Sequence, residues 1–432
     1  MRTTDNKIFN MEKLPEYFND FIDKKVVIAG VGAVGSHLAD FLIRMKVFHL
    51  TLIDFDRFEK QNSSKCSSVY KPNEDSGKNK ASALADDLNE HYEIDTVHGI
   101  DASITCFGPM AFVNYDVVIL ALDNYAAKIY FNQIWLQIPE EKRPLLIFGG
   151  TIGESAQSNC LDGKDGCVRC QFDEGWLVNP LVRTSCTGIN YSPTGDIADH
   201  SITTGLASGY SALLMAEQCR GFFVGHKDMI NRKTEYTAYP NLGLLNMKPL
   251  KRSSCPDCKN YYPIENAEAL NGFDVIHTTV GDLIDVMKIR FPEGKFEIVA
   301  PFMEFGKIAY SKIIKDDFCR CCGKPLNGLY KHEFRTKYKD LMCEGCRSVG
   351  KVASNETRYE KIGTTIGSIS EDTCDEILRN KTLYEVGYTI GGFIKVIHYR
   401  DEIDILADGV DFYNFYCAND ANQMNLITKL EG

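Results

Sequence analysis

The sequence contains no stretch of about 18 uninterrupted apolar residues, which is the length that a membrane-spanning helix needs. Its first residues, 1–10, carry no apolar core of signal-peptide length. Basic residues are not in surplus, because the net charge is −11, so the chain lacks the positive charge that binds nucleic-acid phosphates. Repeats and low-complexity tracts are absent as well. These absences predict a cytoplasmic protein that has neither a membrane nor a nucleic acid as its partner.

Cysteine, in contrast, is plentiful: the chain has 16, and eight of them form four Cys-x-x-Cys pairs. In a chain without a secretion signal, metal binding explains such pairs better than disulfides do. The pairs Cys167/Cys170 and Cys255/Cys258 each have the internal spacing of a Zn(Cys)₄ site. The long gap between the two pairs suits a clip that ties distant segments of one domain together.

A second set of cysteines, Cys319, Cys322, Cys343 and Cys346, has a gap typical of zinc ribbons, and Cys321 is an alternative ligand within it. We therefore predict two structural Zn²⁺ sites, each with four thiolates and no open position for catalysis. For either set the alternative is a group of buried free thiols or a redox pair.

The most informative stretch is an apolar run, residues 25–29, that enters the turn Gly30-Val31-Gly32-Ala33-Val34-Gly35 and continues into a helical pattern. A strand, glycine turn and helix in this order present backbone N–H groups to a phosphate. A second apolar run, residues 50–53, ends in Asp54. An acidic residue about 20 positions past the glycines is where a ribose hydroxyl is held. The stretch therefore predicts a nucleotide site, and its alternative is a glycine turn in an ordinary α/β sheet.

Strand and helix patterns alternate through residues 25–150, which predicts a mainly parallel, doubly wound α/β sheet. Residues 151–200 are rich in Gly, Cys, Asp, Ser and Pro, and we expect them to form a long functional loop. Farther on, short strands are expected at 274–279 and 296–302. The predicted domains are a helical lead-in (1–24), an α/β domain (25–262) and a smaller α+β region (263–432) that contains the second zinc module (318–347).

Charged residues follow several of these strands, and the carboxyl ends of strands in a doubly wound sheet share one crevice. Asp54 and Asp56 follow the second strand, and Asp123 follows a later one. Asp123 suits Mg²⁺ bound to a triphosphate, because magnesium takes carboxylate and phosphate oxygens. Lys65 and Lys80 are placed to neutralise phosphate charge. Each residue alone fits a solvated loop, but together they indicate a site for MgATP.

The order of these residues resembles the ThiF/MoeB/HesA-type family of E1-like activating enzymes. That family has a glycine turn, then D-x-D-x-x-x-x-x-N-x-x-R, then G-x-x-K, then a strand that ends in D-N. Within residues 20–262 the matching positions are Gly30, Gly32, Gly35, Asp54, Asp56, Asn62, Gly77, Lys80, Asp123 and Asn124. Three features depart from the pattern: Lys65 and Lys128 stand where the family has arginine, and residues 1–24 show no arginine motif.

The resemblance implies a Rossmann-like ThiF/E1 adenylation domain that holds MgATP together with the C-terminal glycine of a ubiquitin-like protein. It assigns Asp54 to the ribose, Asp123 to Mg²⁺, and Asn62, Lys65 and Lys80 to the phosphates; Lys80 and Asp123 are thereby catalytic. It also implies a zinc in the first cysteine set and a homodimer.

A candidate nucleophile lies in the expected loop. Ser185-Cys186-Thr187, with Pro193 and His200 downstream, resembles the thioester-forming segment of ubiquitin-type E1s. A thiolate accepts the acyl group of an adenylate, because AMP is a good leaving group and sulfur is strongly nucleophilic. We predict Cys186 as this nucleophile, with Cys160 and Cys66 as alternatives.

The C-terminal third adds a weaker resemblance. Residues 381–397, inside a candidate ubiquitin-fold segment at 356–418, resemble part of a β-grasp fold, and a generic α+β module explains them equally well. Ubiquitin-fold domains of E1 enzymes recruit an E2-like conjugating enzyme. The layout of two zinc sites and a long tail is similar to E1-like proteins of bacterial ubiquitin-like conjugation systems, including antiphage defence operons.

Three other functions stay open at this point. Adenylation followed by sulfur transfer, as in thiamin or molybdopterin synthesis, would yield a modifier thiocarboxylate. A non-catalytic pseudo-E1 scaffold is favoured by the two missing arginines. A nicotinamide dehydrogenase explains the glycines and Asp54 but not Asp56, Asn62, Lys80 and Asp123.

Overall fold

The computed structural model describes most of the chain, in segments. These are residues 15–152, 154–172, 204–237, 242–292, 295–301, 303–305, 308–310, 313–319, 321–332, 342–348, 364–399, 410–420, 424, 427, 428 and 430. Two compact units are present: Met1–Cys106 with Phe112–Pro263 and Gln423–Gly432, and Phe107–Ala111 with Ile264–Asn422. The three-domain assignment made from the sequence stays a prediction. None of the described helices is both long enough and apolar enough to cross a membrane.

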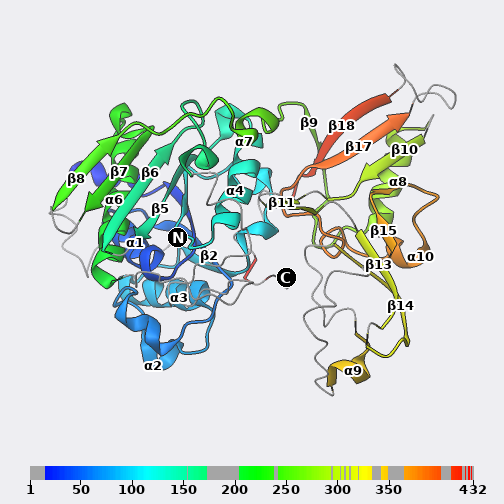
Figure 1. Cartoon of the computed structure of the whole chain (residues 1–432), viewed down its shortest axis with the longest axis horizontal. Helices are drawn as coiled ribbons and strands as arrows, with labels where there is room; N and C mark the ends of the chain where they lie inside the picture. The colour runs from blue at the N-terminus through cyan, green and yellow to red at the C-terminus, as the bar shows by residue number, and fades with distance from the viewer. Residues whose placement is uncertain are drawn as a thin grey trace. The chain divides into compact units, whose positions relative to one another are not determined.

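The first unit is built on an eight-stranded sheet with the order β3-β2-β1-β4-β5-β6-β7-β8 (Figure 1). Strands β1 to β5 pair in parallel, and β6 to β8 continue the sheet in antiparallel pairs. The strands are β1 Lys25–Ala29, β2 His49–Asp54, β3 Val97–Asp101, β4 Val117–Leu120, β5 Leu145–Ile152, β6 Ser155–Leu161, β7 Arg232–Thr237 and β8 Gly243–Met247. The predicted doubly wound α/β class is confirmed.

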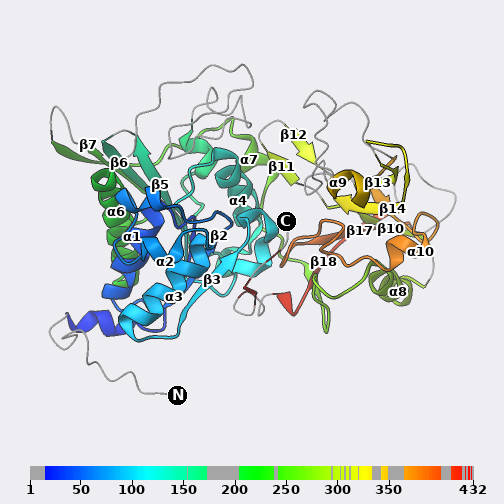
Figure 2. The same ribbon diagram turned by 90° about the horizontal axis from the view of Figure 1, so that it is seen from below.

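Helices cover the parallel half of this sheet. Val26 and Ile28 of β1 share one buried core with Leu38 of α1, Leu84 of α3 and Met215 of α6, so these three helices lie on the same face. Figure 2 shows α1 and α6 side by side. The helices of the unit are α1 Ala33–Arg44, α2 Pro72–Asp75, α3 Lys80–Tyr92, α4 Tyr125–Gln137, α6 Gly205–Phe223 and α7 Pro256–Asn260.

Two local expectations are wrong. The segment predicted as a loop from residue 151 contains β6, because β6 pairs with β5 and its Ser158 hydroxyl donates to Gln218 on α6, a partner 60 residues away. Residues 274–279 form no strand: the Asp274 carboxylate accepts from the backbone N–H of His277 at 2.8 Å, which closes a turn instead. Of the lead-in, the described part forms a short 3₁₀ helix, Glu16–Phe21.

The second unit contains a five-stranded sheet with the order β16-β10-β17-β18-β9. Helix α8 packs on one face, where Leu283 and Met287 meet Ile298, Val396 and Phe415 in a common core. Strands β11 and β12 form a two-stranded sheet, and a three-stranded antiparallel sheet has the order β14-β13-β15. The bounds are β9 Ala267–Leu270, α8 Val280–Arg290, β10 Lys295–Val299, β11 Met303–Phe305, β12 Ile308–Tyr310, β13 Ile313–Phe318, β14 Pro325–His332, α9 Glu344–Ser348, β15 Thr364–Ile366, β16 Ser368–Ile369, α10 Glu376–Arg379, β17 Ile394–Tyr399 and β18 Val410–Cys417.

Candidate active site

The glycine turn lies where β1 separates β2 from β4, the point at which the order of the parallel strands changes direction. Gly30 has φ +85°, and a Cβ there would lie 2.7 Å from the carbonyl oxygen of Ala121. A Cβ on Gly35 would lie 1.9 Å from the Gly30 carbonyl oxygen. A Cβ on Gly32, in contrast, would meet nothing within 4 Å. Gly30 and Gly35 therefore permit the turn and its packing, and Gly32 borders open space at the start of α1.

Asp54, at the end of β2, is bound to this turn. Its Oδ2 accepts from the backbone N–H of Val31 at 2.9 Å, and its Oδ1 accepts from the N–H of Asp56 at 2.9 Å. Each carboxylate oxygen has two lone pairs, so both oxygens retain capacity for a further donor such as a ribose hydroxyl. Burial raises the pKa of Asp54 to about 6, and the nearby charge of Asp56 adds to the shift.

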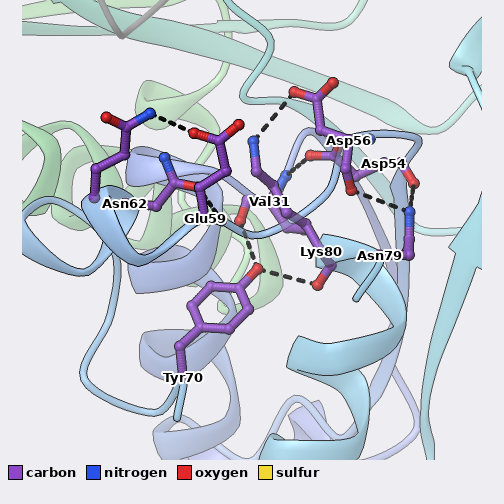
Figure 3. A network of polar contacts seen from close by, with 9 residues as sticks. Val31, Asp54, Asp56, Glu59, Asn62, Tyr70, Asn79 and Lys80 are labelled. Carbon is purple, nitrogen blue, oxygen red and sulfur yellow. Dashed lines mark hydrogen bonds and ion pairs between the residues drawn. The ribbon is translucent and has the colours of Figure 1, made fainter. Parts of the chain in front are cut away.

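Lys80, the first residue of α3, reaches the same place. Its Nζ lies 3.1 Å from Oδ2 of Asp56, and its side chain is only 14% exposed (Figure 3). Burial acts to lower the pKa of Lys80, but the charges of Asp54 and Asp56 outweigh it and raise the pKa overall. A permanently cationic amine therefore lies beside the two carboxylates.

Asp123 follows β4 and completes the group. Its pKa is raised, first by partial desolvation and then by the charge of Asp56, whereas Lys128 and Lys80 act in the opposite direction. The charges of Asp56 and Lys80 therefore act on the carboxylate of Asp123. The next residue, Asn124, has a structural role, because its Oδ1 caps α4 by accepting from the N–H of Ala126 at 2.8 Å.

The two other predicted phosphate residues, Asn62 and Lys65, have surroundings of a different kind, as has Lys128, which stands where the family has arginine. The Oδ1 of Asn62 accepts from the N–H of Glu59 at 2.9 Å and so caps a short 3₁₀ helix, Lys60–Ser64. Lys65 ends that helix, half-buried, with its carbonyl oxygen 3.0 Å from Nε2 of His37. The amine of Lys128 is buried and donates to the carbonyl of Gly149 at 3.0 Å. The nucleotide roles of Asn62 and Lys65 stay predictions.

Two residues that sequence reasoning missed hold the crevice together. Asn79 donates from Nδ2 to the carbonyl of Asp54 at 2.8 Å, while its Oδ1 caps α3 through the N–H of Ser82 at 2.9 Å. An asparagine just before a helix is a recognisable N-cap signal. Tyr70 donates its hydroxyl to the carbonyls of Val31 and Lys80. No local pattern marks Tyr70, because both of its partners are distant backbone groups.

The first cysteine set is assembled in one place. The Sγ atom of Cys167 lies 3.8 Å from that of Cys170 and 3.7 Å from that of Cys255, and those of Cys170 and Cys258 are 3.7 Å apart. These separations suit four thiolates around one tetrahedral ion. The cysteine-bearing segments are also held by hydrogen bonds: buried Asp257, between Cys255 and Cys258, accepts from Arg169 at 2.9 Å and from Asn132 at 2.7 Å.

The second set is also assembled, in the second unit. Cys319, Cys322, Cys343 and Cys346 present sulfur atoms within 4.8 Å of one another, and Sγ of Cys322 lies 3.6 Å from Sγ of Cys343. The backbone N–H of Cys343 donates to Sγ of Cys319 at 3.2 Å, as expected for a thiolate ligand. Both clusters are compatible with zinc, and Cys321 is not a member of the second.

The candidate nucleophile Cys186, with Pro193 and His200, lies outside the described residues. The two alternative nucleophiles, Cys160 and Cys66, lie within the described residues. Cys160 lies inside β6, fully buried, and burial raises the pKa of its thiol to about 12. Cys66 is 9% exposed. Neither environment favours an accessible thiolate.

The sheet order and the glycine turn after β1 define a Rossmann-like α/β protein, with a charged group beside that turn. A model of the ThiF family matches residues 15–379, and the chain belongs to this family. Ubiquitin-like modifier-activating enzyme 5 of Drosophila ananassae is 30% identical over 165 residues, which cover 34% of this chain and 40% of that protein. SUMO-activating enzyme subunit 2 of Dictyostelium discoideum is 28% identical over 151 residues, which cover 34% and 22%.

The chain thus spans about two fifths of the length of the first of these curated relatives and less of the second. Among solved structures, E. coli MccB with ATP is similar with a TM-score of 0.43 and 19% identity, over 56% of this chain and 69% of that one. A structure of PaaA has a TM-score of 0.40 and 19% identity, over 55% and 67%.

Proposed function

We propose that the protein is an E1-like activating enzyme that uses MgATP to adenylate the C-terminal glycine of a ubiquitin-like protein. The observation that carries the proposal is the convergence of the Asp56–Lys80 pair, Asp54 and Asp123 beside the open glycine turn. Membership in the ThiF family and the names of the curated relatives support the same chemistry.

In the proposed reaction, a carboxylate oxygen of the terminal glycine attacks the α-phosphorus of ATP. The bond from that phosphorus to the bridging oxygen breaks, pyrophosphate leaves, and an acyl adenylate forms. Such a displacement depends on positioning and on charge neutralisation. Asp54 holds the ribose, the N–H groups around Gly32 face the phosphates, and Lys80 offsets their charge. Asp123 has the hard oxygen donors that Mg²⁺ requires, and Mg²⁺ when bound would neutralise the triphosphate.

The second proposed step is transfer to Cys186. Its thiolate attacks the acyl carbonyl, AMP leaves with the bonding electrons, and the resulting thioester passes to an E2-like partner. Lys65 and Asn62 assist the phosphates in this proposal. We further propose two structural zinc ions, a homodimer, a cytoplasmic site of action, and a role in a bacterial conjugation system of the antiphage type.

A pseudo-E1 scaffold is the second candidate, because of one contact. Lys128 stands where the family has arginine, and its amine is already bonded to the Gly149 carbonyl. Lysine also lacks the planar two-pronged grip of arginine on phosphate. A scaffold would bind the modifier without pyrophosphate exchange. A sulfur-transfer enzyme would instead exchange pyrophosphate and yield a modifier thiocarboxylate, which mass spectrometry identifies.

ATP–pyrophosphate exchange with MgATP and a panel of ubiquitin-like proteins ending in glycine tests adenylation. We expect exchange that depends on the modifier and falls at least about 100-fold in Asp123→Asn, since charge stabilisation at the phosphates is lost. Asp86→Asn, an exposed aspartate on α3, is the matched control and should exchange normally. Exchange that survives in Asp123→Asn would contradict the assigned role, and absence of exchange with every modifier would favour the scaffold.

A further inference from the structure

The Tyr70 hydroxyl joins the two halves of the proposed phosphate site. Its oxygen lies 2.9 Å from the carbonyl oxygen of Val31 and 3.0 Å from that of Lys80 (Figure 3). Both partners are acceptors only, so the hydroxyl is the donor and shares its one hydrogen between them. The first acceptor belongs to the glycine turn, and the second is the first residue of α3.

Packing holds the Tyr70 ring in this orientation. The side chain is 3% exposed, and its ring lies 4.4 Å from that of Phe58, which is fully buried. Phe58 is itself fixed by two backbone bonds: its N–H donates to the Lys78 carbonyl at 2.8 Å, and its carbonyl accepts from the Gly77 N–H at 2.8 Å. Burial also raises the pKa of Tyr70 well above its usual value, so the hydroxyl keeps its proton.

The bond from Tyr70 to the Val31 carbonyl also sets the direction of the N–H of Gly32, which belongs to the same peptide. A trans peptide is planar, and its C=O and N–H point in opposite directions. The carbonyl of Val31 and the N–H of Gly32 belong to one peptide, so a carbonyl held toward Tyr70 aims the Gly32 N–H away from it. Gly32 borders open space, because a Cβ there would meet no atom within 4 Å. The preceding peptide is fixed as well, by the 2.9 Å bond from the Val31 N–H to Asp54.

The bond to Lys80 fixes the other half. Holding the Lys80 carbonyl anchors the first turn of α3, from which the Lys80 side chain extends to Asp56 at 3.1 Å. One hydroxyl therefore sets the direction of the Gly32 amide and the separation of the glycine turn from the Lys80 backbone. Phenylalanine would fill the same space but could bond to neither carbonyl.

We infer that Tyr70 is a positioning residue for the nucleotide triphosphate, acting through the Gly32 amide and Lys80 without touching the ligand. The inference rests on the proposed function, because it assigns these two groups to the phosphates of ATP. It adds Tyr70, which lies outside the family motif, to the residues that the proposed function requires.

Calorimetric titration of the full-length protein with MgATP and, separately, with adenosine tests the inference. Tyr70→Phe removes one oxygen atom and should weaken MgATP binding about fivefold to tenfold, the value of one hydrogen bond, while adenosine binds as in the wild type. A merely structural defect would weaken both ligands alike or lower the fraction that binds. Tyr115→Phe, which removes a hydroxyl 3.0 Å from Thr51 Oγ1, is the matched control.

Hydrogen exchange of the wild type supplies a test that does not require a folded variant. The Gly32 amide should be protected by MgATP and not by adenosine. Equal MgATP affinity in Tyr70→Phe and wild type, or equal protection of Gly32 by adenosine, would overturn the inference and leave the proposed function intact. A wild type that binds no MgATP would overturn both.

Discussion

Asp54 serves the fold and the site with the same carboxylate. Two of its lone pairs accept backbone N–H groups of Val31 and Asp56, and each oxygen keeps capacity for a further donor. Because burial raises its pKa to about 6, the ionised form that accepts a ribose hydroxyl best is complete only above that pH. The ordinary pKa of an aspartate would place this transition near pH 4.

We therefore expect adenosine affinity to fall as the pH is lowered through about 6, and to approach a tenfold loss per pH unit below it. The sign follows from protonation, which occupies an acceptor oxygen and removes the negative charge. Adenosine is the better probe because it carries no phosphate that titrates in this range. Titrations from about pH 7 to about pH 5 measure the effect.

Asp54→Asn separates this effect from general acid damage. The amide keeps the size of the side chain but does not titrate, so its adenosine affinity should be low and independent of pH. A wild-type midpoint near pH 4, or an unchanged slope in Asp54→Asn, would show that another group controls binding.

The sequence predicted the charged members of the site because they follow strand ends at motif spacing. Lys80 does pair with Asp56, and the charges of both act on Asp54 and Asp123, while the nucleotide roles of all four residues stay predictions. It did not predict Tyr70, whose acceptors are backbone carbonyls 39 and 10 residues away. A sequence motif identifies side chains at fixed spacing. A hydroxyl that donates to distant backbone carbonyls has no such spacing, because its partners depend on the three-dimensional fold.

Among the elements, the first cysteine cluster connects residues 167–170 to residues 255–258, neither of which lies in any strand of the described residues. Cys167 caps a 3₁₀ helix, Val168–Gln171, Cys170 lies within that helix, and Cys255 precedes α7. The amide of Gln171 adds a reciprocal pair of bonds to the backbone of Leu250, at 2.8 and 2.9 Å. Four thiolates and a metal would close a loop of more than 80 residues, which predicts a large contribution to stability.

We expect two zinc ions per chain by mass spectrometry of metals, and one in Cys258→Ser. Loss of this zinc should lower the stability of the first unit by roughly 2 kcal/mol or more, equivalent to about 5 °C in Tm. Cys374→Ser, at a cysteine outside both clusters, is the control and should retain both ions. A Cys258→Ser protein with full zinc content and unchanged Tm would exclude the clip.

Apolar runs predicted the parallel strands well, since strands buried on both faces need continuous apolar sequence. Strand β6 escaped notice because its sequence, Ser-Ala-Gln-Ser-Asn-Cys-Leu, is polar. Its Ser158 is buried only because Gln218 on α6 satisfies the hydroxyl. The error at residues 274–279 is the reverse, a strand predicted where a turn forms. Apolar Val275 and Ile276 suggested the strand, but the Asp274 carboxylate accepts from the backbone N–H of His277, which closes the turn.

At the scale of the whole molecule, adenylation and thioester formation are separate reactions that need separate groups. In the proposed function, Asp54, Asp56, Lys80 and Asp123 are assigned to adenylation, and thioester formation requires a reactive thiol. Cys160 is buried in β6 with its pKa raised to about 12, and Cys66 is 9% exposed. Their burial leaves Cys186 as the strongest of the three candidates that the sequence offers.

Incubation with MgATP and a glycine-ending modifier, followed by a non-reducing gel, tests this division. The wild type should form an adduct that thiol reagents release, Cys186→Ala should form none, and Cys160→Ala should resemble the wild type. Pyrophosphate exchange should persist in Cys186→Ala, because adenylation precedes attack by the thiolate. An adduct that survives in Cys186→Ala would move the nucleophile to another cysteine. Exchange without any adduct in the wild type would instead indicate adenylation without a thioester, and a modifier thiocarboxylate found by mass spectrometry would then identify the sulfur-transfer class.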